Sequence, residues 1–425
     1  MPSSMELNYK SDMKRYFLVV VLVCAALTAR AQITLDEYRT SVMEYSWLLK
    51  SRNSQSEEAR ENVSRAKSGF LPSLAASGSF KVPFRHVEGV RHWDFSLQPQ
   101  IVQTLYAGGS VRAAWQGAEL DYNIALCNEA FAMLDVRYAA DHAYWTLSAM
   151  AQYLSSVQRY VAIIKSLKQL VDARFAEGYI AKGDVLQIDS RLSEAIYQLS
   201  VAEQNHSVAM HNFNILRGEY LDVNVQLAQT ILDSLPLPER VPFENIIASR
   251  PDYAASDLAR QRSVVAVQSA RAPFNPQVNV GVGGVWAPYS PNRTGQTQIN
   301  GSLVAQVSVP IFHWGERRRA VAAAMERSRQ SGFAQSQLYD DIMREEMNGW
   351  VTLVDSRAQV EASIRSMLIA QENLEISTYS YSEGVTTILD VLQAQISWLQ
   401  LYTNRITAQY NYAVAVSDYQ RITAR

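Results

Sequence analysis

Four stretches of the chain alternate apolar and polar positions with a period of two. They cover residues 73–82, 94–105, 276–286 and 299–311. In the last stretch, Leu303 and Val307 fall on one face, while Ser302 and Gln306 fall on the other. Strands of about ten residues with one apolar and one polar face are typical of a membrane barrel with a water-filled lumen. A half-buried sheet in a soluble protein would alternate in the same way.

Long helices are predicted by the distribution of proline. Proline is absent between Pro99 and Pro236 and again after Pro310. Because proline is excluded from helix interiors, these regions can remain helical without interruption. We expect helices over about 109–175 and 316–381, each roughly 100 Å long at 1.5 Å per residue. A single globular core does not require such helices, whereas a coiled-coil-like assembly does.

Heptad spacing indicates how the other two long helices pack. Apolar residues recur in steps of three and four from Val185 to Leu216 and form one seam. The last segment carries two seams, one from Leu392 to Ala413 and one from Val391 to Ala415. Two seams predict a helical neighbour on each side, as a closed wall of helices requires. An ordinary buried helix of a bundle is the alternative interpretation.

The two halves of the chain repeat each other. Residues 177–187 and 383–393 both read Glu-Gly, five residues, then Asp-Val-Leu-Gln. The same register aligns Gly109 with Gly315 and residues 105–106 with 311–312. Each half therefore has one order of elements: a helix, a proline-marked break, two strands, a very long helix, a glycine turn and another long helix. We divide the chain into a first repeat at 32–220, a linker at 221–248 and a second repeat at 249–425.

Residues 1–31 have the pattern of a signal peptide for export. Lys14 and Arg15 precede an apolar segment over 16–27, and residues 29–31 match a small-x-small cleavage site. An uncut membrane anchor is the alternative. Cleavage would remove Cys24 and leave Cys127 as the only cysteine, so no intrachain disulfide is expected. An exported chain without disulfides depends on a large core, a metal or oligomer contacts to stay folded.

Composition and motifs exclude several function classes. The chain has 39 basic and 41 acidic residues, a formal net charge of −2, so we expect no nucleic-acid partner. It contains no HExxH zinc motif, Walker loop, GxGxxG or GxSxG motif. We therefore expect no enzymatic activity, cofactor or metal site.

Four strands cannot close a barrel, and open strand edges are not tolerated in lipid. Three chains would supply twelve strands, an even number within the known range. The predicted fold class is an α+β membrane protein, a homotrimer whose twelve-stranded β-barrel, four strands per chain, continues into an α-helical coiled-coil barrel. The links at 85–93 and 289–295 would be the external loops.

Residues 381–392, followed by Tyr410-Asn411-Tyr412, resemble the signature of the TolC outer-membrane efflux family. The resemblance covers nearly the whole mature chain. It implies a trimer with its barrel in outer-membrane lipid, its helical barrel in the periplasm and residues 221–248 in an equatorial region. It further implies a passive channel that receives substrates from an inner-membrane pump through a periplasmic adaptor. The alternative is a periplasmic coiled-coil adaptor or scaffold protein.

The resemblance also implies a periplasmic gate at the helix tips. Gly178 and Gly384 match the tip glycines where an adaptor docks. Tyr381 and Asp184 match members of a latch that holds the tips closed. Asp390 matches an aspartate that forms a negative, cation-attracting ring around the channel axis.

Two positions depart from the family pattern at this gate. Thr386 stands where relatives carry a basic latch partner, which argues against a salt bridge to Asp184. Gln393 stands where a second aspartate ring is often found, which weakens the expected cation binding. For each tip residue the alternative is an ordinary solvated turn.

Overall fold

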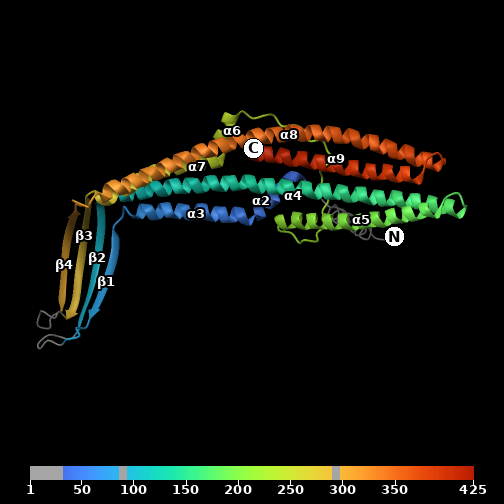
Figure 1. The fold of residues 1–425 in the computed structure, drawn as a ribbon. Helices are drawn as coiled ribbons and strands as arrows, with labels where there is room; N and C mark the ends of the chain where they lie inside the picture. Colours follow the sequence, from blue (N-terminus) through green and yellow to red (C-terminus); the bar gives the residue numbers. More distant parts are fainter. Residues whose placement is uncertain (1–31, 86–92, 290–296) are drawn as a thin grey trace, which may run out of the picture.

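The protein is described from a computed structural model, which covers residues 32–85, 93–289 and 297–425. The predicted signal peptide at 1–31 and most of both predicted external loops lie outside these residues. Figure 1 shows the β-sheet at one end, joined at an angle to a bundle of long helices. The two helix-turn-helix tips lie together at the opposite end of the molecule (Figure 1).

The sheet is antiparallel with the order β1-β2-β3-β4. Its strands are β1 (Ser73–Lys81), β2 (Asp94–Ala107), β3 (Gln277–Tyr289) and β4 (Gln298–Ser308). The central β2–β3 pair joins the two repeats. The outer edges of β1 and β4 have no partner strand within the described part of the chain. The predicted four strands and their antiparallel hairpins are therefore confirmed.

β4 ends three residues earlier than the sequence predicts. Its last residue, Ser308, pairs with Gln277, the first residue of β3. Two positions later comes Pro310, which has no N–H to donate to a neighbouring strand. The alternation of side chains continues beyond Ser308, but the hydrogen-bonded ladder does not.

The two pairs of long helices repeat with identical lengths. The helices of the described chain are α2 (Leu35–Tyr45), α3 (Trp47–Ser68), α4 (Ser110–Ala176), α5 (Lys182–Leu216), α6 (Phe243–Ser249), α7 (Pro251–Arg271), α8 (Glu316–Ser382) and α9 (Ile388–Ile422), with a short 3-10 turn, η1 (Ala272–Phe274), after α7. α4 and α8 each have 67 residues, and α5 and α9 each have 35. The two copies are related by a shift of 206 residues. Among residues 32–85, 93–289 and 297–425, no helix has both the length and the hydropathy needed to cross a membrane.

The aromatic contacts between helices are similar in the two copies of the repeat. Tyr38 of α2 stacks on Phe213 of α5 with ring centroids 3.9 Å apart, and its hydroxyl donates to the Phe213 carbonyl. In the second copy, Tyr419 takes the position of Phe213 and packs against Trp350 at 5.4 Å. The Tyr419 hydroxyl accepts a hydrogen bond from the backbone N–H of Val241 in the linker. Each copy thus has its own aromatic core, and the linker bonds to both, since the Gln229 N–H donates to the Tyr144 hydroxyl of the first.

Two buried carboxylates fix the N-terminal helix and the linker to the long helices. Asp141 of α4 accepts two hydrogen bonds from the Arg39 guanidinium, at 2.5 and 2.7 Å. Glu346 of α8 accepts two from Arg240, at 3.0 and 3.2 Å. Such bidentate pairs are geometrically specific, so they hold the crossing segments in one register.

α5 and α9 have different numbers of neighbours. Ile188, Ala195, Ala202 and Ala209 are buried at seven-residue spacing along α5, which packs on α4. α9 packs on both α8 and α4, with buried residues on two sides. The two seams predicted for the last helix are confirmed. α5 has only one long-helix neighbour within the described chain.

Candidate functional site at the helix tips

Both helix-turn-helix tips begin with the same backbone turn. Gly178 follows α4 with φ +81°, and Gly384 follows α8 with φ +77°. The N–H of Gly178 donates to the Phe175 carbonyl and that of Tyr179 to the Arg174 carbonyl. This is the Schellman pattern of helix termination, and its left-handed position favours glycine. Glycine therefore recurs at both predicted tips because the turn that ends each long helix needs a residue with a left-handed φ.

The start of α9 is capped by its own side chains. Thr387 is the N-cap residue and forms a reciprocal capping box with Asp390. Asp390 Oδ2 accepts hydrogen bonds from the Thr386 hydroxyl, the Thr387 hydroxyl and the Thr387 N–H. The two threonine hydroxyls, followed by the backbone N–H, lower the pKa of Asp390 below its usual range. Since all three bonds go to Oδ2, the exposed carboxylate keeps its negative charge and a free oxygen.

The start of α5 lacks such a cap. Its N-cap residue is Ala181, which has no side chain able to accept a hydrogen bond. Asp184, at the position of Asp390 in the repeat, is half-buried, and its backbone N–H donates to the Ala181 carbonyl. Its carboxylate forms no hydrogen bond or ion pair with any described residue. The two tips therefore share a turn and differ in the chemistry of the following helix.

Tyr381 links the two tips through Arg174, a basic residue that neither the motif nor the repeat singles out. The Tyr381 side chain is 3% exposed, and its hydroxyl has no hydrogen-bond partner within the described residues. The guanidinium of Arg174, in the last turn of α4, lies 4.8 Å from the centre of the Tyr381 ring. The Arg174 Nη2 also donates to the Ser382 carbonyl at 2.8 Å. Burial raises the pKa of Tyr381, and the Arg174 charge partly offsets that rise.

The sequence gives only a weak indication that Arg174 belongs to the site. Basic residues are common in the last turn of a helix because they interact favourably with its negative end. The repeat gives no help, because the position equivalent to Arg174 in the second copy is Ser380. Thr386, where a basic residue was expected, is not basic, but Arg174 places a positive charge beside Tyr381.

A groove of about 690 Å³ runs between the tips and collects several of the predicted gate residues. Its lining includes Arg174, Asp184, Tyr381, Gly384 and Thr386. Asp390 joins this group only through its bonds to Thr386 and Thr387. The remaining predicted residues, Gly178 and Gln393, lie outside the groove, and Gln393 is exposed on α9.

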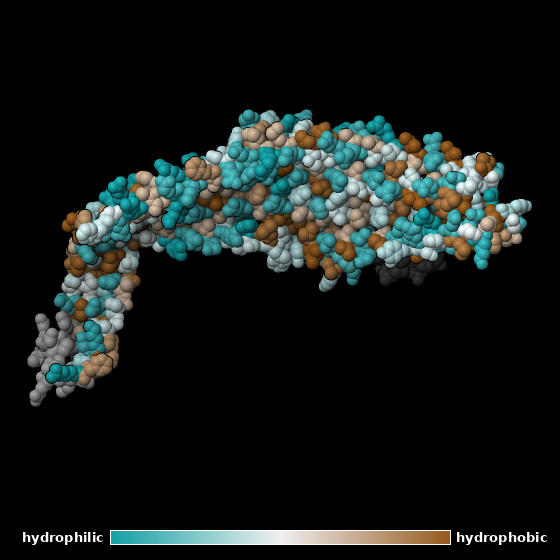
Figure 2. All heavy atoms as spheres, in the orientation of Figure 1, coloured by the Kyte–Doolittle hydropathy of each residue, from teal (hydrophilic) through white to brown (hydrophobic). Residues whose placement is uncertain are grey.

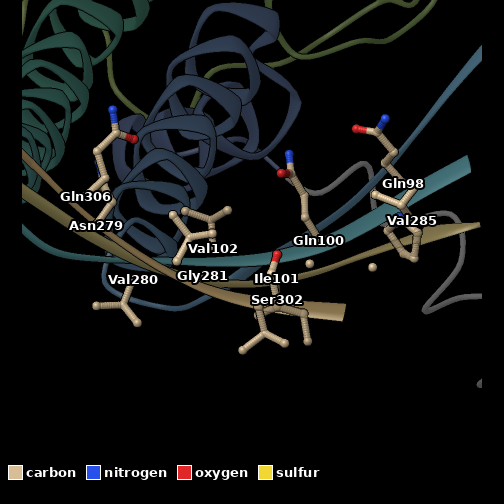
Figure 3. A pocket seen from close by; sticks show the side chains of 15 residues that line it. Gln98, Gln100, Ile101, Val102, Asn279, Val280, Gly281, Val285, Ser302 and Gln306 are labelled. Atoms are coloured by element: carbon tan, nitrogen blue, oxygen red, sulfur yellow. The ribbon is translucent and has the colours of Figure 1, made fainter. Parts of the chain in front are cut away.

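The opposite end of the molecule has a polar surface on one face of the sheet. Figure 3 shows the amide side chains of Gln98, Gln100, Asn279 and Gln306 on one face. The Val280 side chain points to the other face (Figure 3). Carboxamides and hydroxyls bind water without carrying charge, so this face fits an aqueous passage.

Comparison with known proteins gives one consistent family. The sequence model described as "Outer membrane efflux protein" matches residues 46–213 and 243–424. The chain is 24% identical to nodulation protein T of Rhizobium leguminosarum bv. trifolii over 375 residues, 80% of this chain and 74% of that protein. It is 20% identical to the outer membrane protein TolC of Escherichia coli K12 over 432 residues, 93% of this chain and 84% of that protein. The solved CmeC outer membrane channel of Campylobacter jejuni superimposes with a TM-score of 0.80 at 18% identity, covering 92% of this chain and 85% of that one.

Proposed function

This chain belongs to the outer membrane efflux protein family, and we propose that it forms a homotrimeric channel that conducts substrates passively to the cell exterior. The channel serves an efflux or secretion system. Its barrel lies in the outer membrane, and its helical part extends into the periplasm. An inner-membrane pump and a periplasmic adaptor deliver the substrates, and the protein itself catalyses no reaction.

The observation that carries this proposal is the sheet with two open edges. Within the described part of the chain, β1 and β4 each leave one edge unpaired, and both strands have a face of exposed apolar side chains, such as Leu74 and Leu303. Lipid cannot hydrogen-bond such edges. Pairing of β4 with β1 of the next protomer would satisfy both edges, and three protomers would close twelve strands with the amide-bearing face inward.

The helices support the same threefold closure. α5 has exposed apolar residues on its outer side, including Tyr197 at 71% and Ile215 at 56%. α8 has a comparable exposed set, including Ile369 at 69% and Tyr379 at 67%. Packing of α5 against α8 of an adjacent protomer would give α5 the second neighbour that α9 already has and would close the helical wall.

The groove between the tips is the proposed gate. Arg174, Tyr381 and the Ser382 carbonyl hold the end of α4 against the end of α8. Separation of the two tips would break this contact and widen the passage, which is a hinge-like movement of helix pairs. Asp390, repeated three times around the axis, attracts cations at the entrance. Gly178 and Gly384 present the turns to which the adaptor binds.

The proposal is tested with the purified mature protein. We expect a detergent-dependent trimer by light scattering, heat-modifiable migration on gels and discrete conductance in planar bilayers. A monomer that stays soluble without detergent and conducts no ions would contradict the proposal and favour a periplasmic adaptor or scaffold.

A further inference from the structure

The junction between β4 and α8 combines features that the first copy of the repeat lacks. Trp314 has φ +47° and is 91% exposed. The equivalent residue in the first copy is Gly108, with φ +65°. A left-handed backbone is unfavourable for a residue with a side chain, so glycine is the expected choice here. The second copy instead holds a large aromatic side chain in the solvent at this strained position.

More exposed apolar surface surrounds Trp314. Phe312 is 69% exposed and packs edge-on against Trp314 at 5.0 Å, and Ile311 is 93% exposed. Figure 2 shows apolar residues gathered where the sheet meets the helices, with hydrophilic residues next to them on the helical side. Aromatic residues at the border between an apolar band and water are typical of a membrane interface.

Three arginines lie directly beside this surface. Arg317 and Arg318 belong to the first turn of α8, and Arg271 ends α7. Together with Val321 and Met325 they line an open groove of about 510 Å³. None of the three guanidinium groups forms a hydrogen bond or ion pair with a residue that the structure describes. The position equivalent to Arg317 in the first copy is Val111, whereas the position equivalent to Arg318 is Arg112. Arg317 is therefore the arginine of α8 in this groove that is specific to the second copy.

We propose that the groove between Arg271, Arg317 and Arg318 binds the phosphate headgroup of an anionic phospholipid. The guanidinium groups supply donors that match phosphate oxygens. The acyl chains continue towards the sheet along the apolar surface at Trp314 and Phe312, while Val321 and Met325, further along α8, line the groove beside the headgroup. Unpaired arginines next to an apolar border are the arrangement that recognises acidic lipids. This inference rests on the proposed outer-membrane location.

The binding test uses the intact trimer. Native mass spectrometry would measure retention of phosphatidylglycerol and of phosphatidylcholine by the wild type and by the triple variant Arg271→Gln, Arg317→Gln, Arg318→Gln. We expect the triple variant to lose at least about tenfold in apparent affinity for phosphatidylglycerol, since each arginine near an anionic surface contributes roughly fivefold. Retention of phosphatidylcholine should not change. Millimolar inorganic phosphate should not displace the lipid, because the apolar part of the site binds the chains.

Further variants test the positive charge and the apolar border of the groove separately. The matched triple lysine variant should keep most of the binding, because it keeps the charge. Trp314→Gly should weaken binding while relieving the backbone strain. Arg327→Gln changes an exposed arginine further along α8 and is the control.

Three results would overturn the proposal: unchanged phosphatidylglycerol binding in the triple glutamine variant, an equal loss in the control, or dissociation of the trimer with lipid binding retained. The last result would assign the arginines to a contact between protomers. Failure of the wild type to form a trimer would instead contradict the proposed function.

Discussion

Arg174 at the end of α4 stacks over Tyr381 at the end of α8, with 4.8 Å between the guanidinium carbon and the ring centre. The two residues come from different copies of the repeat, so their contact joins the two helix pairs. The same guanidinium donates to the Ser382 carbonyl. A single side chain therefore couples the two tips by a cation–π contact and a hydrogen bond.

Replacing Arg174 should favour the open gate. Arg174→Gln removes both contacts, which together contribute about 1–2 kcal/mol per protomer. We expect larger and more frequent openings in planar-bilayer recordings. Arg159→Gln, at an exposed position on the same helix, is the control and should behave as the wild type. Conductance of Arg174→Gln that matches the control would remove Arg174 from the gate.

Cations that bind at Asp390 should block the channel over an unusually wide pH range. Its folded pKa is lowered by the Thr387 and Thr386 hydrogen bonds, so the carboxylate stays charged as the pH falls to the ordinary carboxyl range. The charge, and the capping that depends on it, are lost only when the pH falls through the lowered folded pKa.

We expect block by trivalent cations in planar bilayers to persist at about pH 4. Asp390→Ala should abolish the block, whereas Gln393→Ala should leave it intact. Unchanged block in Asp390→Ala would exclude the proposed ring.

The tip glycines should be sensitive for a purely backbone reason. A Cβ at Gly178 or Gly384 would meet no atom within 4 Å, but both residues have a left-handed φ. Alanine at either position should lower the free energy of unfolding by about 1 kcal/mol.

Gly183 is equally open, lies inside the first turn of α5 and has no left-handed φ. Gly183→Ala should therefore be neutral or stabilising by up to about 1 kcal/mol. Thermal unfolding followed by circular dichroism measures all three variants, and equal effects at the three positions would refute the backbone explanation.

Gln395 should be a destabilising residue in the core of the second helix pair. It is 1% exposed, and neither atom of its amide has a hydrogen-bond partner among the residues described. Gln395→Leu removes a buried amide from apolar surroundings and should stabilise the protein by about 1–3 kcal/mol. Gln400→Leu, at an exposed position on the same helix, should change stability little. A lower unfolding temperature for Gln395→Leu than for the wild type would show that the amide is bonded.

The features predicted well from the sequence are those set by local rules. The absence of proline and the glycine turns placed α4 and α8 within one residue of their observed ends. Period-two alternation identified the four strands, and the two seams of α9 matched its two neighbours. These signals succeed because backbone geometry and burial act on residues close in sequence.

The contacts at the helix tips could be predicted only in part. The capping box of Thr387 and Asp390 follows a readable pattern, a threonine followed three residues later by an acid. The Arg174–Tyr381 contact joins residues 207 positions apart in non-equivalent places of the two copies, so neither periodicity nor the repeat reveals it. Gln395 belongs to neither predicted seam of α9, so the spacing of apolar residues does not indicate that its side chain is buried.

The identical lengths of the paired helices set a rule for how this protein can change. The two hairpins end side by side (Figure 1), which would give a level rim at the proposed periplasmic mouth. Inserting one residue in α4 alone would shift the end of α4 by about 1.5 Å and rotate it by roughly a quarter of a circle relative to α5 and α8. Arg174 would then no longer face Tyr381. Evolution can therefore lengthen this tube only through matched insertions in both halves, ideally in multiples of seven residues.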